Sequence, residues 1–157
     1  MNIQSAIKKG STILADSKIP SSRLDSEILL SKALNKERRY IFLNSFEKLS
    51  NNVLKNFYNL IKERLSGKPI AYIVGKKEFW KFEFDVNENV LIPRPDTELI
   101  VEEVLKLTKN KSNIKILDIG VGSGCLILSI LKERKGFYGV GIDISKKCLE
   151  ISKLNSN

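Results

Sequence analysis

Three glycines within five residues form the part of the sequence best suited to binding a ligand. Gly120, Gly122 and Gly124 stand in the stretch LDIGVGSGC, directly behind the apolar run KILDI. Glycine lets backbone N–H groups approach a ligand closely, because it has no side chain in the way. The helical pattern CLILSILKER follows at once, so the glycines mark a turn from a buried strand into a helix.

A second strand and helix would complete this site. FYGVGID predicts a strand and SKKCLEISKLN predicts a helix, which gives the order β-α-β-α and hence a parallel sheet with right-handed crossovers. Ligands of such sheets bind at the carboxyl ends of the strands, so we expect the glycine turn and Asp143 to meet in space. Asp143 stands 23 residues after Gly120, and its carboxylate can accept hydrogen bonds from both hydroxyls of a ribose.

The glycine spacing and a preceding carboxylate favour one nucleoside ligand over another. Dinucleotide-binding turns read G-x-G-x-x-G, whereas this turn reads G-x-G-x-G and follows Asp118. A carboxylate opposes a pyrophosphate, but S-adenosylmethionine has no phosphate and carries an ammonium group. We therefore favour S-adenosylmethionine over a dinucleotide. The alternative without a ligand is a tight turn, with Asp143 as a helix cap.

The first half of the chain has the pattern of short helices. SSRLDSEILLSKALN and SNNVLKNFYNLIKERLSG each begin with a serine that can cap a helix and continue with apolar residues at helical spacing. Residues 3–14 and 38–43 predict further helices. These segments indicate a helical bundle that packs and docks, since none has catalytic spacing and the chain contains no histidine.

The middle of the chain changes from helical to alternating periodicity. Apolar and polar residues alternate in EFWKFEFDV, and NEN then separates them from VLI, which predicts a β-hairpin. The prolines of IPRPDTE favour extended backbone, after which a helix is expected over residues 96–109.

Composition excludes some classes of protein and leaves others open. No apolar run approaches the roughly 20 residues of a membrane span and no secretion signal is evident, so a cytoplasmic protein is expected. Cys125 and Cys148 are expected to be reduced thiols, and no metal site is expected. The net charge is +9, with 13 basic against 6 acidic residues in the first 70. Because the lysines are dispersed, biased composition explains this charge better than an acidic or RNA-bearing partner does.

Five segments resemble the bacterial release-factor glutamine methyltransferases, in the order found in that family: RLDSEILLSKAL, GKPIAYIVGKKEFW, VNENVLIPRPDTELIVE, ILDIGVGSGCLILSI and VGIDIS. The glycine motif is common to many methyltransferases, whereas GKPIAYIVG…EFW joined to LIPRPDTE is more specific. The resemblance implies an α-helical N-terminal bundle, a β-hairpin and an α/β domain with a Rossmann-like sheet of seven strands. It also implies methyl transfer from S-adenosylmethionine to the side-chain amide of the glutamine in the Gly-Gly-Gln loop of peptide chain release factors.

The resemblance assigns roles to particular residues. It adds Val121 and Ser123 to the glycines and Asp143 as contacts of S-adenosylmethionine, and it places Arg94 to Thr97 near the cofactor pocket. A helix cap explains Thr97 equally well, as an ion pair explains Arg94. The implied domains are a substrate-docking domain over residues 1–73, a hairpin linker over 74–93 and a methyltransferase domain over 94–157.

One element of the family pattern is missing from this sequence. Relatives carry the catalytic motif Asn-Pro-Pro-Tyr after their fourth strand, and these 157 residues do not contain it. We therefore expect the N-terminal portion of such an enzyme, inactive alone, with no catalytic residue and with apolar strand faces that lack neighbours. Two alternatives are a non-catalytic fragment that binds a release factor and a nucleic-acid amino-methyltransferase. The second is disfavoured, because no basic and aromatic stripe is present, and direct contact with nucleic acid is not expected.

Overall fold

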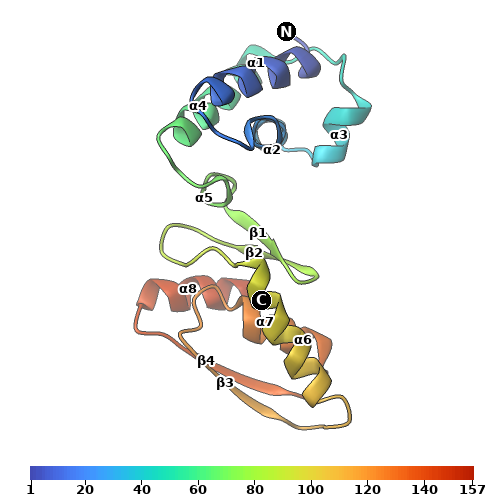
Figure 1. Cartoon of the computed structure of the whole chain (residues 1–157), viewed down its shortest axis with the longest axis vertical. Helices are drawn as coiled ribbons and strands as arrows, with labels where there is room; N and C mark the ends of the chain where they lie inside the picture. The colour runs from blue at the N-terminus through green and yellow to red at the C-terminus, as the bar shows by residue number, and fades with distance from the viewer. The chain divides into compact units, whose positions relative to one another are not determined.

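The chain divides into a helical part and an α/β part. The computed structural model describes residues 1–157, which form two compact units, Met1–Val74 and Gly75–Asn157 (Figure 1). No helix combines the length and the apolar character needed to cross a membrane. The expected α/β class with an N-terminal helical bundle is confirmed, and each of its two sheets has two strands.

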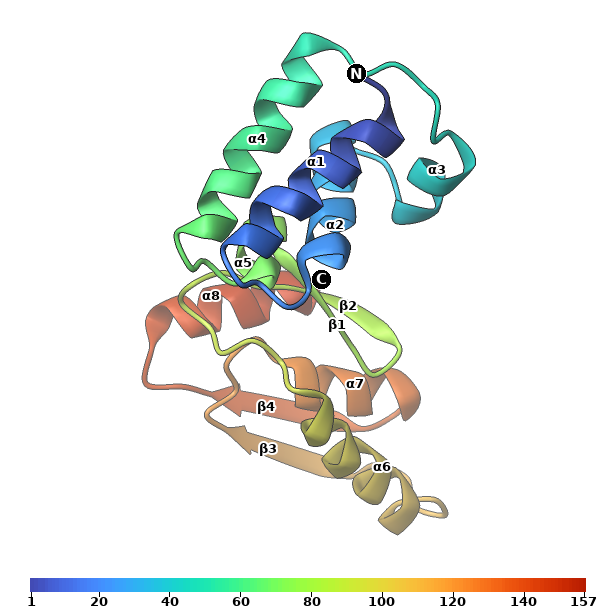
Figure 2. The same cartoon turned by 45° about the horizontal axis from the view of Figure 1, so that its top comes forward.

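The helical unit is built around three helices that pack side by side. Figure 2 shows α1, α2 and α4 together, with α3 and α5 beside them. Their shared core contains fully buried side chains from each of the three, among them Leu14, Leu29 and Phe57. The predicted helices are all present, and α5 is an additional one. The bounds are α1 Ile3–Asp16, α2 Ser22–Leu34, α3 Arg38–Leu43, α4 Asn51–Leu65 and α5 Ile70–Val74.

Side-chain hydrogen bonds fix the ends and contacts of these helices. The Ser50 hydroxyl accepts the Val53 N–H at 3.3 Å, so the predicted cap of α4 is present. Ser26 of α2 donates to the Ile7 carbonyl of α1 at 2.9 Å. The buried Asp25 carboxylate accepts a hydrogen bond from Arg64 of α4 at 2.7 Å, which ties α2 to α4. The buried side chains of Asp25 and Ser26 are thus paired, whereas the buried Ser31 hydroxyl of α2 has no hydrogen-bond partner.

The second unit begins with an antiparallel hairpin of β1, Lys76–Phe79, and β2, Phe82–Asp85. The expectation that NEN turns this hairpin is wrong, because Phe79 pairs with Phe82 and the turn is Trp80–Lys81. Trp80 adopts a positive φ of 58°, and its backbone N–H donates to Glu98 at 2.7 Å. That hydrogen bond helps to hold a conformation that tryptophan rarely adopts.

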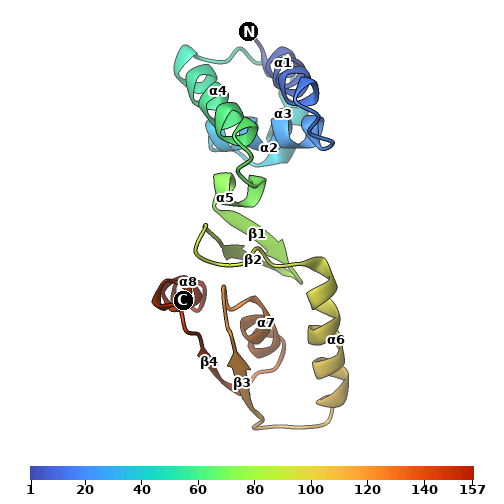
Figure 3. The ribbon, with the colours of Figure 1, turned by 60° about the vertical axis from the view of Figure 1, so that its left-hand side comes forward.

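A parallel pair of strands follows, as the β-α-β-α order predicts. Lys115 of β3 pairs with Tyr138 of β4, and the register runs on to Ile119 beside Ile142. Figure 3 shows α7 beside these strands and α6 next to α7. The helix expected over 96–109 begins as a 3-10 turn, Pro95–Thr97. The other bounds are α6 Glu98–Leu107, β3 Lys115–Ile119, α7 Cys125–Glu133, β4 Tyr138–Ile142 and α8 Lys146–Asn155.

The two faces of the β3–β4 sheet differ in burial. On one face Ile116 packs into a core that includes Phe79, Val101 and Ile130. The other face is apolar and bare, as the sequence predicts for strands without neighbours. Its exposed side chains are Leu117, Ile119, Val140 and Ile142.

Candidate cofactor-binding site

The glycine turn connects the end of β3 to the start of α7. Backbone N–H groups of Gly120 and Val121 both donate to the Ile142 carbonyl, at 2.8 and 3.0 Å. Ile142 is the last residue of β4, and the two strands are parallel, so this pair of bonds fixes the turn at the carboxyl edge of the sheet. Ligands of parallel α/β sheets bind at that edge.

Asp143 lies against this turn. One of its carboxylate oxygens accepts the Gly122 N–H at 3.0 Å, and the other accepts the Ser145 N–H at 2.9 Å. The expectation that the turn and Asp143 meet in space is therefore confirmed. These hydrogen bonds, first from Ser145 and then from Gly122, hold the pKa of Asp143 below its usual value. The Cys148 thiol and the Ile144 N–H act in the same direction, so the side chain is ionised at neutral pH and serves as a hydrogen-bond acceptor.

Two of the glycines in the turn serve different purposes. Gly120 has a φ of +82°, and a Cβ atom built on it would have no atom within 4 Å, so open space lies beside this part of the backbone. Gly124 has nearly the same φ of +83°, but a Cβ atom there would lie 2.8 Å from the Ser152 hydroxyl and 2.9 Å from a Leu128 methyl. Gly120 leaves room for a ligand, whereas Gly124 allows α7 and α8 to pack closely.

Asp118 brings a second carboxylate to the same region. It lies on β3, half-buried, and the pKa of its carboxyl group is raised, mainly by burial and also by the negative charge of Asp143. A backbone N–H of Ile127 acts in the opposite direction. Two neighbouring carboxylates make this edge of the sheet electronegative, which suits a cationic group and opposes a phosphate.

The structure also shows a polar residue at this site that sequence reasoning missed. Asn155, at the end of α8, donates to the carbonyls of Ser123 at 2.9 Å and Asp85 at 3.0 Å, and its own oxygen accepts the Asp85 N–H at 2.7 Å. It thereby links the glycine turn to β2. No signal in the sequence could have indicated this, because an asparagine near the end of a helix usually has only a local role.

No hydrogen bond or ion pair connects Thr97 or Arg94 to the glycine turn. Thr97 belongs to the 3-10 turn before α6 and makes no hydrogen bond to residues 118–124; its N–H donates to the Arg94 carbonyl at 3.1 Å. Its side chain does not cap α6, and Arg94 forms no salt bridge. Neither simple structural explanation for these two residues is therefore observed. Cys125 and Cys148 are free thiols, as expected.

Comparison with known proteins shows what the two units are similar to. Residues 5–75 match the PrmC N-terminal domain. The chain is 45% identical over 157 residues to a release factor glutamine methyltransferase of Leptospira interrogans, an alignment that covers 99% of the chain and 54% of that relative. The resemblance to this family is confirmed.

Further relatives agree on the family and on the extent of the match. The release factor glutamine methyltransferase of Coxiella burnetii is 40% identical over 157 residues, which cover 99% of the chain and 56% of that relative. A Buchnera aphidicola protein of the same name is 43% identical over 136 residues, 87% of the chain and 49% of the relative. The chain spans about half the length of the curated relatives it matches.

Proposed function

We propose that the chain contributes the cofactor-binding turn and the substrate-docking domain of a protein-glutamine methyltransferase. The reaction is methyl transfer from S-adenosylmethionine to the side-chain amide of the glutamine in the Gly-Gly-Gln loop of peptide chain release factors. The observation that carries the proposal is the hydrogen bond from Gly122 to Asp143 at the edge of two parallel strands. It occurs in a chain that is similar over almost its whole length to release factor glutamine methyltransferases.

The residues at the turn fit this cofactor. Open space beside Gly120 accommodates a ligand close to the backbone, and the ionised Asp143 carboxylate is a suitable acceptor for ribose hydroxyls. Asp118 supplies negative charge for the ammonium group. When bound, S-adenosylmethionine supplies an electrophilic methyl group on its sulfonium. The proposed contacts are Gly120, Val121, Gly122, Ser123, Gly124, Asp118, Asp143 and, on family resemblance alone, Thr97.

The proposal also extends to domains and setting. Residues 1–73 form the docking domain, 74–93 the hairpin linker and 94–157 the methyltransferase domain, with β3 and β4 as two strands of a Rossmann-like sheet of seven. A release factor as substrate implies a cytoplasmic protein. We assign no catalytic residue within these 157 residues.

Calorimetry on the 157-residue chain tests the cofactor. We expect saturable binding of S-adenosylmethionine and none of NAD. The substitution Asp143→Ala should weaken the binding of S-adenosylmethionine about tenfold or more, because the ribose hydroxyls lose their acceptors. Asp16→Ala, a change at an exposed aspartate of α1, is the matched control and should bind like the wild type.

The folded state of each variant is checked by the fluorescence of Trp80, the one tryptophan in the chain. Equal affinities of the folded wild type and the folded Asp143→Ala variant would contradict the role of Asp143. Tight binding of NAD would contradict the choice of cofactor. The substrate is tested separately, by binding of a purified release factor to the same chain.

A further inference from the structure

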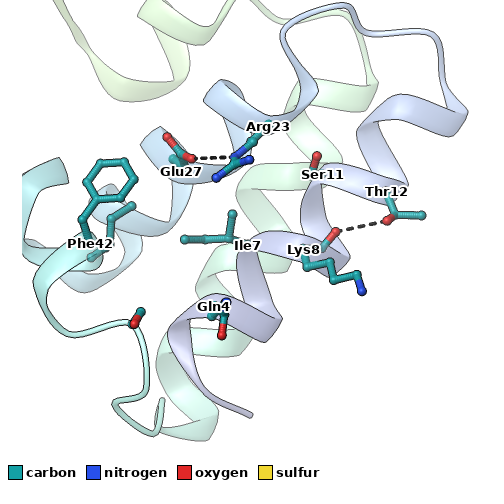
Figure 4. Close-up of a pocket in the computed structure, with 10 residues that line it drawn as sticks. Gln4, Ile7, Lys8, Ser11, Thr12, Arg23, Glu27 and Phe42 are labelled. Atoms are coloured by element: carbon teal, nitrogen blue, oxygen red, sulfur yellow. Dashed lines mark hydrogen bonds and ion pairs between the residues drawn. The ribbon is translucent and has the colours of Figure 1, made fainter.

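The helical unit contains a groove that the proposed cofactor site does not use. A hollow of about 450 Å³ lies beside another of about 510 Å³, and both are lined by Arg23, Glu27 and Phe42. Figure 4 shows these three side chains around the first hollow. We term the two together the α2–α3 groove. Its residues that matter here are Ile7, Lys8, Arg23, Glu27, Arg38 and Phe42.

The charge of the groove is positive. The Glu27 side chain is only 5% exposed, and both of its oxygens are occupied: one accepts from Arg23 at 3.2 Å and the other from Arg38 at 2.7 Å. The buried carboxylate is therefore neutralised within the protein. Three cations, Lys8 and the two arginines, line the groove against this one carboxylate, and the Arg23 side chain is 81% exposed. The groove consequently favours a partner that carries carboxylates.

The groove also offers an apolar surface. Figure 4 shows Ile7 and the Phe42 ring among the side chains that line the first hollow. Phe42 is 53% exposed, and the Arg38 guanidinium stands over its ring at 5.4 Å. An exposed aromatic ring next to arginines is the composition of a protein-binding hot spot. Nucleic acid fits less well, because the apolar wall of the groove offers its phosphates no partner.

We propose that the α2–α3 groove binds an acidic segment of the protein substrate. A bulky apolar side chain of that segment packs against Phe42, and a neighbouring carboxylate pairs with Arg23. The inference rests on the proposed function, since it takes the release factor as the partner. The inference goes further than the proposed function, because it names the surface of the helical unit that binds the release factor and the acidic and apolar side chains that this surface recognises.

Fluorescence anisotropy with a labelled release factor and the whole 157-residue chain tests the groove. Phe42→Ala and Arg23→Gln should each weaken binding about tenfold, because the first removes the apolar contact and the second removes the cation that pairs with a carboxylate of the partner. Arg23→Gln leaves Glu27 paired with Arg38, so the fold is preserved. The matched controls are Phe46→Ala, at a phenylalanine 77% exposed, and Arg39→Gln, at a side chain 80% exposed; neither residue lines the groove.

The outcomes separate the two proposals. Weakening by both groove variants, with the controls within about twofold of the wild type, supports the groove. Wild-type affinity in all four variants overturns the groove and leaves the proposed function intact. Absence of release factor binding by the wild type overturns both the groove and the proposed substrate. Displacement of the release factor by a single-stranded RNA oligonucleotide overturns the choice of a protein segment as the occupant.

Discussion

Two carboxylates at the glycine turn have opposite relations to stability. Asp143 is held ionised by backbone N–H groups, so it contributes stability above its ordinary pKa that is lost as the pH falls through the lowered value. Asp118 has a raised pKa, so its ionisation opposes folding, and that cost appears as the pH rises through the window between its ordinary and raised values. A group that the fold retains at a cost to stability is a candidate for function.

The substitution Asp118→Asn tests whether this carboxylate lowers stability while it supports cofactor binding. Asp118→Asn should raise the free energy of unfolding at neutral pH, and the gain should shrink as the pH falls from the raised to the ordinary aspartate pKa, below which the wild-type carboxyl is neutral in the folded and the unfolded state. The same variant should bind S-adenosylmethionine more weakly. Urea unfolding followed by Trp80 fluorescence, at pH values between about 3 and 7, measures the first effect. Glu150→Gln, at an exposed residue of α8, is the control variant. If Asp118→Asn is less stable than the wild type at neutral pH, ionisation of Asp118 does not oppose folding.

At the scale of elements, local patterns predicted most helices and the parallel strand pair, because caps and apolar periodicity are encoded by neighbouring residues. The hairpin turn was misplaced since Trp80–Lys81 contains none of the glycine or asparagine that usually marks a turn with positive φ. Helix α5, only five residues long, offers too few periods to detect. The meeting of the glycine turn with Asp143 was predictable from the glycines, the β-α-β-α order and the position of both segments at the carboxyl ends of strands.

The contact of α8 with the turn could not be predicted, because it joins residues far apart in the sequence. Asn155 makes three hydrogen bonds to Ser123 and Asp85. Asn155→Ala should therefore lower the free energy of unfolding by about 1–3 kcal/mol, since the partners lose bonds in a partly buried place. Urea unfolding followed by Trp80 fluorescence measures this change in the free energy of unfolding. Ser156→Ala removes a hydroxyl that bonds only within the helix end and should change little; equal stabilities of the two variants would argue against the link.

At the scale of the whole molecule, the bare face of β3 and β4 sets the second unit apart from the helical one. Val140 is 61% exposed on this face, whereas Val101 in the core beneath the other face is completely buried. An apolar face of this kind invites association with other apolar surfaces. The sequence predicted the face from the apolar strand residues, but only the structure shows which residues of each strand it contains.

The same substitution at two valines measures the difference between the faces. Val140→Thr should change the free energy of unfolding by no more than about 0.5 kcal/mol, because its side chain is exposed. Val101→Thr should cost about 1–3 kcal/mol, because it buries a hydroxyl. Val140→Thr together with Ile119→Thr should also weaken any self-association seen by sedimentation velocity. A large loss of stability on Val140→Thr would mean that the face is covered in solution.

The bare face also affects how the second unit responds to temperature. The heat capacity increase on unfolding grows with the apolar surface that becomes newly hydrated. Side chains such as Leu117 and Ile119 are already hydrated in the folded state, whereas Leu29, Leu30 and Phe57 of the helical unit are not. Residue for residue, the second unit therefore has the smaller heat capacity increment. Its stability accordingly varies less steeply with temperature, on cooling as well as on heating.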